Sequence, residues 1–219
     1  MTIFKNSKNF VVNSFYNFKE RILFDLVHRT TSSQRLEIEQ FISTTPLDHG
    51  KDYYASWTSE IKNNHAFLMT HINDDFKNYH FVDLGCGKGK VCLLWHKLNQ
   101  KKGIQQNITG IDFYYPLIQI AKSNYRKLFL EEGHFIHGNV ADFNFLALKK
   151  PLIIYLFNPF DEYMLDCVLN KIGKIPTYVV YNIPMHWNVL SNHAYQRIYA
   201  KSGANQNQTT LIYTNIKSS

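Results

Sequence analysis

Residues 81–94 read FVDLGCGKGKVCLL, which is an apolar strand, a turn rich in glycine and the start of an apolar helix. Gly85, Gly87 and Gly89 stand at alternate positions of the turn. Because glycine has no Cβ, such positions allow positive φ angles and let a ligand lie directly against the backbone. The unpaired N–H groups at the start of the helix favour a negatively charged or carboxylate group there. The stretch therefore predicts a ligand-binding turn.

Two phosphate-binding patterns are excluded by the spacing. The dinucleotide pattern G-x-G-x-x-G requires a glycine at position 90, where the chain has Lys90. The phosphate loop of nucleoside triphosphatases requires four residues between its glycines, followed by Lys and Ser or Thr. Gly85 and Gly89 enclose three residues, and Val91 follows Lys90. An ordinary tight connection between a strand and a helix remains the alternative.

Composition indicates a globular protein that is not exported. A chain of 219 residues forms one large domain or a domain with an appendage. Its 45% apolar and 15% aromatic content excludes disorder. No apolar run reaches the roughly 18 residues of a membrane span, and residues 1–29 lack the apolar centre of a signal peptide. We expect a cytoplasmic protein.

The cysteine and histidine residues do not suggest a metal site. Cys86, Cys92 and Cys167 form an odd set without a Cys-x-x-Cys motif, which is typical of free thiols in a reducing compartment. His134 and His137 would face opposite sides of a predicted strand. We therefore expect no metal ion.

Basic residues are concentrated in the second part of the chain. The net charge is +7, and residues 81–219 hold 15 Lys and Arg against 8 Asp and Glu. This excess favours an acidic partner or nucleic acid. No block of five like charges occurs, so a solvated surface is the simpler interpretation.

Strands and helices alternate after residue 80, which predicts a parallel sheet covered by helices. Helices are predicted at 9–29, 60–76, 88–100, 116–132 and 161–173. Strands are predicted at 81–84, 108–112, 134–137, 151–157 and 177–183, with a terminal hairpin of 195–200 and 209–214.

An acid ends the second predicted strand. Asp112 lies 23 residues after Gly89, the distance at which a strand-helix-strand unit brings a carboxylate to ribose hydroxyls. Taken alone, Asp112 could equally cap the helix that begins at Tyr114 or Tyr115.

The run Asp83-Leu-Gly85-Cys-Gly87-Lys-Gly89 resembles the first motif of class I S-adenosylmethionine (SAM)-dependent methyltransferases. The resemblance spans about 80–216. It implies a Rossmann-like three-layer α/β sandwich with a seven-stranded sheet of order 3-2-1-4-5-7-6. Residues 80–219 would be the SAM-binding domain, and residues 1–79 a helical extension and cofactor lid. The glycines would pass the methionine part of SAM, with Asp83 at its amino end. Asp112 would bind the ribose hydroxyls, and Phe113 would pack on the adenine.

Some positions depart from the family pattern. Asn139 holds the position of the usual adenine-binding acid, and the nearest carboxylate is Asp142, so which of the two contacts adenine is open. The resemblance also makes Tyr53 and Tyr54 candidate lid residues. The predicted cofactor contacts are Asp83, Gly85, Cys86, Gly87, Gly89, Asp112, Phe113, Asn139, Val140, Asp142, Asn158 and Tyr54.

Asn158-Pro159-Phe160 follows the predicted strand 151–157 and resembles a shortened form of the [Asn/Asp]-Pro-Pro-aromatic motif of amino-group methyltransferases. The second proline is missing. The resemblance makes these three residues the candidate catalytic group, in which Asn158 positions the acceptor and Phe160, Tyr53 or Tyr54 forms a wall facing the sulfur. A plain strand-to-helix turn is the alternative.

These patterns together predict a SAM-dependent methyltransferase whose acceptor is an amino nitrogen, with protein lysine as the leading candidate. The alternatives are a nucleic-acid methyltransferase, a small-molecule methyltransferase, a nucleotide-dependent oxidoreductase, and a SAM-binding module without catalytic activity.

Overall fold

The computed structural model describes residues 15, 18–33, 53–203 and 208–217. Predictions that fall on residues 9–14, on most of 30–60 and on the hairpin turn at 204–207 lie outside the described residues.

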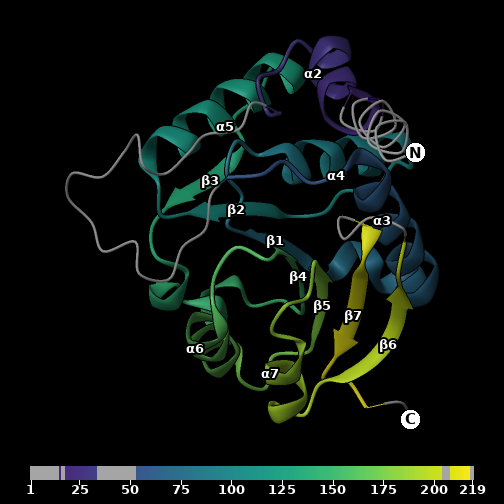
Figure 1. The fold of residues 1–219 in the computed structure, drawn as a ribbon, viewed down its shortest axis with the longest axis vertical. Helices are drawn as coiled ribbons and strands as arrows, with labels where there is room; N and C mark the ends of the chain where they lie inside the picture. The colour runs from purple at the N-terminus through teal and green to yellow at the C-terminus, as the bar shows by residue number, and fades with distance from the viewer. Residues whose placement is uncertain (1–14, 16–17, 34–52, 204–207, 218–219) are drawn as a thin grey trace, which may run out of the picture.

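A seven-stranded sheet forms the centre of the molecule (Figure 1), and its strand order is β3-β2-β1-β4-β5-β7-β6. The strands are β1 His80–Leu84, β2 Ile108–Asp112, β3 His134–His137, β4 Leu152–Phe157, β5 Thr177–Asn182, β6 Gln196–Lys201 and β7 Thr210–Thr214. β1 to β5 pair in parallel, and β7 lies antiparallel between β5 and β6. The predicted Rossmann-like sheet with its terminal hairpin is confirmed.

Helices cover both faces of the sheet (Figure 1). One layer holds α3 Thr58–Ile72, α4 Lys90–Lys101 and α5 Tyr115–Phe129, and the other holds α6 Glu162–Ile172 and α7 Trp187–Asn192. The N-terminal segment adds the π-helical turn η1 Phe18–Ile22 and α2 Leu23–His28. Short 3-10 turns lie at η3 Asn73–Asn78, η4 Val140–Asp142 and η5 Phe145–Leu148. No helix among the described residues is long and apolar enough to cross a membrane.

Two apolar cores lie on opposite faces of the sheet. Phe81, Tyr155 and Trp95 belong to the core under α3, α4 and α5, whereas Val82 and Leu156 belong to the core over α6 and α7. β1 and β4 are buried on both faces, as expected of parallel strands in the middle of a sheet covered by helices. Helix α3 supplies Ile61 and Leu68 to the first core and so packs with the sheet. The boundary predicted at residue 79 stays a prediction.

The predicted strands agree with the structure to within about two residues, but the helix boundaries differ more. α3 begins at Thr58 instead of residue 60, and the helix predicted at 9–29 is seen over its described part until it ends at Arg29, which has a φ of 54°. Helix α7 was not predicted because its six residues are too short to show a helical period.

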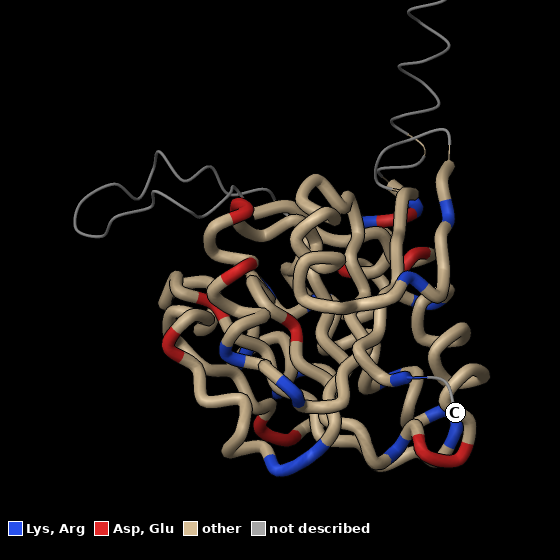
Figure 2. Tube along the Cα trace, turned by 90° about the horizontal axis from the view of Figure 1, so that it is seen from below, with Lys and Arg blue, Asp and Glu red and all other residues tan. Residues whose placement is uncertain are grey.

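Figure 2 shows Lys and Arg at several separate places along the described chain, with Asp and Glu at others. The basic residues of 81–219 lie on several helices, strands and connections and do not gather on one element. This arrangement agrees with the simpler interpretation of the net charge.

Candidate active site

The glycine turn joins β1 to α4 at the carboxyl edge of the sheet, beside the point where strand order reverses. Gly85, Gly87 and Gly89 have φ angles of +74°, +52° and +82°, a region that favours glycine. The backbone N–H groups of Gly85 and Cys86 donate to the carbonyl of Ile111 on β2, at 2.9 and 3.0 Å. The turn is thereby held against the neighbouring strand. Ligands of open α/β sheets bind at this kind of crevice.

Asp112 is the last residue of β2, and its carboxylate organises two backbone segments. Its Oδ2 accepts from the Gly87 N–H at 2.8 Å, and its Oδ1 accepts from the Tyr114 N–H at 2.9 Å, just before α5. Burial raises the pKa of Asp112 to about 6, although the two backbone N–H groups act against this shift. A carboxylate oxygen accepts more than one hydrogen bond, so both oxygens remain able to accept a ligand hydroxyl.

Asp83 is fully buried at the end of β1. The Cys92 thiol lies 3.8 Å from its Oδ2, and burial together with the charge of Asp112 raises the pKa of Asp83 to about 8. A nearby positive charge would stabilise the ionised form of a carboxyl group in such surroundings. Cys86 is also buried, and burial raises the pKa of its thiol well above its usual value. Its thiol is therefore protonated.

The residues predicted on the adenine side lie past the ends of β2 and β3. The Phe113 side chain is 39% exposed, and Val140 is buried in the core over α6. The Asn139 side-chain oxygen accepts from the Ala141 N–H at 3.0 Å and so begins η4. Asp142 is exposed at the end of the same turn. Which of Asn139 and Asp142 meets adenine stays a prediction.

Asn158 and Pro159 follow β4 and lie against the glycine turn. A Cβ added to Gly85 would lie 2.5 Å from the Pro159 Cβ, so the two turns touch. Asn158 has a φ of 46°, and its Oδ1 accepts from the Tyr181 hydroxyl at 3.5 Å. The next segment also begins α6, because the Asp161 side chain accepts from the Met164 N–H.

Phe160 is only 7% exposed and packs in the core over α6 and α7. Most of its ring is therefore covered by other residues of this core. The predicted role of Phe160 as a wall facing the sulfur stays a prediction.

Of the two candidate lid tyrosines, Tyr53 lies on the glycine turn. Atoms of its ring lie 2.0 and 2.2 Å from the position that a Cβ on Gly87 would take. Tyr54 is 39% exposed, and the Arg21 guanidinium lies 5.7 Å from its ring centre. Neighbouring residues of an extended segment point to opposite sides, so only one of the pair can face the turn.

Sequence reasoning missed three buried polar side chains around the turn. Lys88 and Lys90 are 2% and 1% exposed, and Asn124 on α5 is fully buried. The available signal was the position of Lys88 and Lys90 between glycines and an apolar helix. A lysine buried at such a position needs a hydrogen-bond partner, because lysine is almost never fully buried unless it is paired.

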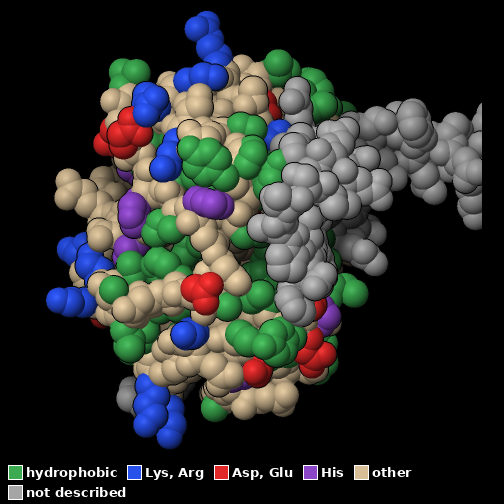
Figure 3. Space-filling model, turned by 90° about the vertical axis from the view of Figure 1, so that its left-hand side faces the viewer, with side chains coloured by type: hydrophobic (Ala, Val, Ile, Leu, Met, Phe, Trp, Pro, Cys, Tyr) green, Lys and Arg blue, Asp and Glu red, His purple; other side chains and the backbone are tan. Residues whose placement is uncertain are grey.

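The carboxyl ends of β2 and β3 point to the left in Figure 1, and Figure 3 shows the molecule from that side. Hydrophobic side chains and histidines lie in the middle of this face, whereas most Lys and Arg side chains stand singly near its margin. The described part of the face is therefore not a basic surface.

Comparisons with known proteins agree with this geometry. Residues 75–183 match the family model described as a methyltransferase domain. The search of curated proteins finds no significant match.

Solved structures share the fold at low sequence identity. Magnesium protoporphyrin IX methyltransferase from Synechocystis, crystallised with SAM, superposes with a TM-score of 0.52 at 10% identity, over 72% of this chain and 77% of that one. A Pyrococcus horikoshii protein gives 0.53 at 14% identity, over 71% and 89%. A candidate class I methyltransferase from Listeria monocytogenes gives 0.56 at 14% identity, over 81% and 64%.

The sheet order and the turn after β1 define a nucleoside-binding α/β domain of the class I methyltransferase type. With the match over residues 75–183, this domain belongs to the class I SAM-dependent methyltransferase family. The protein is a SAM-dependent methyltransferase, and its cofactor is SAM.

Proposed function

We propose that the protein transfers the methyl group of SAM to an amino nitrogen of a protein, with lysine as the leading acceptor. The observation that supports this proposal is the position of Asn158. Asn158 directly follows β4 and precedes Pro159, which contacts the glycine turn, and its amide oxygen is a hydrogen-bond acceptor that could orient an amine.

SAM fits the residues around the glycine turn. The three glycines give the turn its positive φ angles, the Asp112 oxygens can accept ribose hydroxyls, and a positive charge would stabilise the ionised form of the buried Asp83. Asp83 and the glycine turn would hold the methionine part, and Asp112 the ribose. When bound, SAM supplies a methyl group on a positively charged sulfur.

Asn158 would act on the acceptor by alignment. Its Oδ1 would accept a hydrogen of the amine and so aim the nitrogen lone pair, and Tyr181 would keep the amide in place. Correct orientation of two reactants can lower the activation barrier by several kcal/mol. The Tyr53 ring lies over Gly87 and would exclude water from that end of the site.

A lysine acceptor must first lose its proton, because an ammonium group has no lone pair. The ordinary lysine pKa of about 10.4 therefore makes the rate rise with pH over the physiological range. This dependence separates an amine acceptor from a carboxylate acceptor, which is already ionised at pH 6.

The experiment is to incubate the purified protein and labelled SAM with extract fractions that contain only proteins, only nucleic acids or only small molecules. We expect label in the protein fraction, recovered after hydrolysis as methylated lysine. Asn158→Ala should lose the label, while the matched variant Asn170→Ala, on the exposed face of α6, should keep it. Label confined to RNA or DNA would refute the protein acceptor.

Nucleic acid is the second candidate acceptor. The observation that favours it is the excess of 15 basic over 8 acidic residues in 81–219. Binding to nucleic acid would then weaken steeply with salt, because basic side chains release counterions. Salt-independent turnover would argue against this candidate.

A further inference from the structure

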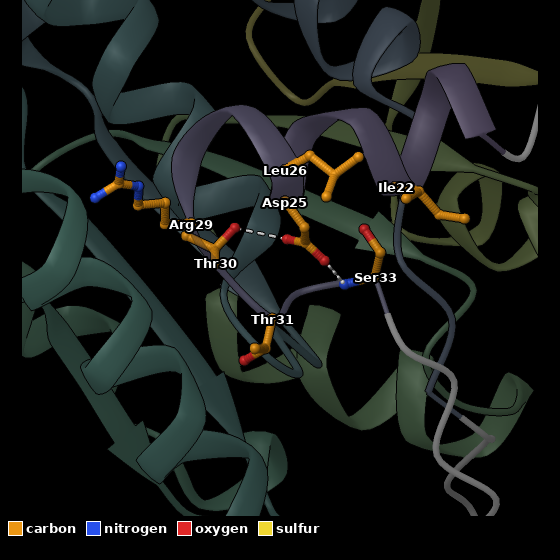
Figure 4. A pocket seen from close by; sticks show the side chains of 7 residues that line it. All are labelled: Ile22, Asp25, Leu26, Arg29, Thr30, Thr31 and Ser33. Atoms are coloured by element: carbon orange, nitrogen blue, oxygen red, sulfur yellow. Dashed lines mark hydrogen bonds between the residues drawn. The ribbon is translucent and has the colours of Figure 1, made fainter.

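The N-terminal segment contains a turn, residues 30–33, that is organised by one carboxylate. Asp25 on α2 accepts from the Thr30 hydroxyl at 2.6 Å, from the Ser32 N–H and hydroxyl at 2.9 and 2.7 Å, and from the Ser33 N–H at 2.6 Å. Figure 4 shows the carboxylate pointing from the helix into this turn, beside a pocket of about 640 Å³. Partial burial acts to raise the pKa of Asp25, but these hydrogen bonds outweigh it and lower the pKa.

The turn holds Tyr53 by its hydroxyl. The Tyr53 O–H donates to the Ser32 carbonyl, and the ring of the same tyrosine lies on Gly87. The Lys88 ammonium is 5.6 Å from the centre of this ring. Tyr53 therefore joins the 30–33 turn, which its hydroxyl contacts, to the glycine turn, on which its ring lies.

A second connection runs through Asn124. Its Oδ1 accepts from the Thr31 N–H at 3.1 Å, and its Nδ2 donates to the Lys88 carbonyl at 3.2 Å. A single, fully buried amide on α5 thus joins the 30–33 turn to the glycine turn. Because the amide of Asn124 is bonded to both segments, it holds the 30–33 turn at a fixed distance from the glycine turn.

The start of the segment is fastened separately. Lys90 donates to the Glu20 carbonyl at 2.6 Å, and the Glu20 carboxylate accepts from the Ser59 N–H at 2.8 Å. Lys90 follows the last glycine of the turn, so the same loop contacts both ends of residues 20–33. Burial lowers the pKa of Lys90 to about 7.

We propose that Asp25 and Asn124 are positioning residues for the cofactor: they hold the 30–33 turn so that Tyr53 stays on the glycine turn and slows the release of SAM. This inference rests on the proposed cofactor site. The general reason is preorganisation: a side chain that is already held in its binding position loses little conformational entropy when the ligand binds, and this raises the affinity.

The test compares Asp25→Ala, Asn124→Ala and Tyr53→Phe with the wild type and with the matched control Asn64→Ala. Asn64 is also a buried asparagine on a helix, but its Nδ2 donates to Asn182 on β5. Two quantities are measured for each: the dissociation rate of SAM in stopped flow, and hydrogen exchange of the backbone N–H groups of residues 31–33.

We expect Asp25→Ala and Asn124→Ala to release SAM about tenfold faster, because each loses hydrogen bonds that hold the 30–33 turn. Exchange at residues 31–33 should rise in both variants. Tyr53→Phe keeps the ring and should show a smaller increase in release rate. Turnover at saturating SAM should change little in Asp25→Ala and Asn124→Ala, because the hydrogen bonds of both side chains go to residues 30–33 and to the Lys88 carbonyl. The control should lose stability but release SAM at the wild-type rate.

Unchanged release in Asp25→Ala and Asn124→Ala, with faster exchange, would overturn the positioning role. Unchanged exchange would show that Asp25 does not hold the turn. If the wild type binds SAM but methylates no protein, only the acceptor proposal fails. If the wild type binds no SAM, the cofactor site and this inference fail together.

Discussion

The two turns at the carboxyl edge touch each other but are built in opposite ways. The glycine turn after β1 bears few side chains, and its shape depends on positive φ angles and on the carboxylate of the next strand, Asp112. The turn after β4 carries an amide side chain, Asn158, which Tyr181 contacts. In the site that we propose, backbone geometry and Asp112 would form the cofactor side, and the Asn158 side chain would form the acceptor side. Cofactor binding and acceptor choice would then be able to change independently.

The largest effect is expected for Asp112→Ala, which should weaken SAM binding by at least about 100-fold. The variant loses the two hydrogen bonds that the ribose hydroxyls would donate to the carboxylate. A hydrogen bond to a charged group is worth about 1.5–3 kcal/mol. Isothermal titration with SAM measures the change. Asp166→Ala is the control, because Asp166 lies on α6, outside the predicted site, and pairs with His193. Equal affinity in Asp112→Ala would refute the ribose role.

The acceptor side should respond differently. Asn158→Ala should keep the Kd for SAM within about twofold but lose about 100-fold in turnover. A loss of about this size is expected when a reactant is misplaced by about 1 Å. Steady-state kinetics and SAM titration of the same sample give both values. A loss of SAM binding as large as the loss of turnover would mean that the two sides are not separable.

Gly85→Ala probes the contact between the two turns. The new Cβ would lie 2.5 Å from Pro159 Cβ, whereas a Cβ on Gly103, which also has a positive φ, meets nothing within 4 Å. Both variants bear the cost of the backbone conformation, of about 1 kcal/mol. Gly85→Ala should lose about 1–3 kcal/mol more through overpacking. Urea unfolding compares the two, and equal losses would show that the turns do not press on each other.

The smallest expected effect is the pH dependence of SAM binding. The pKa of Asp83 is raised to about 8, so this carboxyl group is largely protonated at pH 7. A positively charged amino group favours the ionised form, so SAM binding should release a fraction of a proton, and affinity should rise from pH 6.5 to 7.5. The pKa of Asp112, about 6, lies below this window.

Titration in buffers of different ionisation enthalpy measures the released proton. Asp83→Asn should abolish the release and flatten the dependence on pH. Release that persists in this variant would assign the proton to another group.

The sequence was informative where the backbone itself restricts residue type. Positive φ angles at Gly85, Gly87 and Gly89 favour glycine, and the strand before them is mostly apolar because both of its faces are buried. The sheet order followed from the resemblance that this turn carries. Asp112 was predicted because its distance from Gly89 is set by one strand-helix-strand unit.

The contacts of residues 18–33 could not be predicted, because they join residues that are far apart in the chain. Thr31 meets Asn124 across 93 positions, and Lys90 meets Glu20 across 70. No local period or motif encodes such pairs. Phe160 shows the same limit: its residue type suits an aromatic wall, but its packing in the core over α6 and α7 depends on residues distant in the chain.

A crystal structure with S-adenosylhomocysteine, the product of SAM, tests the central claim most directly. We predict that both ribose hydroxyls lie within about 3 Å of the Asp112 oxygens, a hydrogen-bond distance, with the methionine part against the backbone of residues 85–89. A nucleoside bound at another place, or no binding at saturating ligand, would contradict the account.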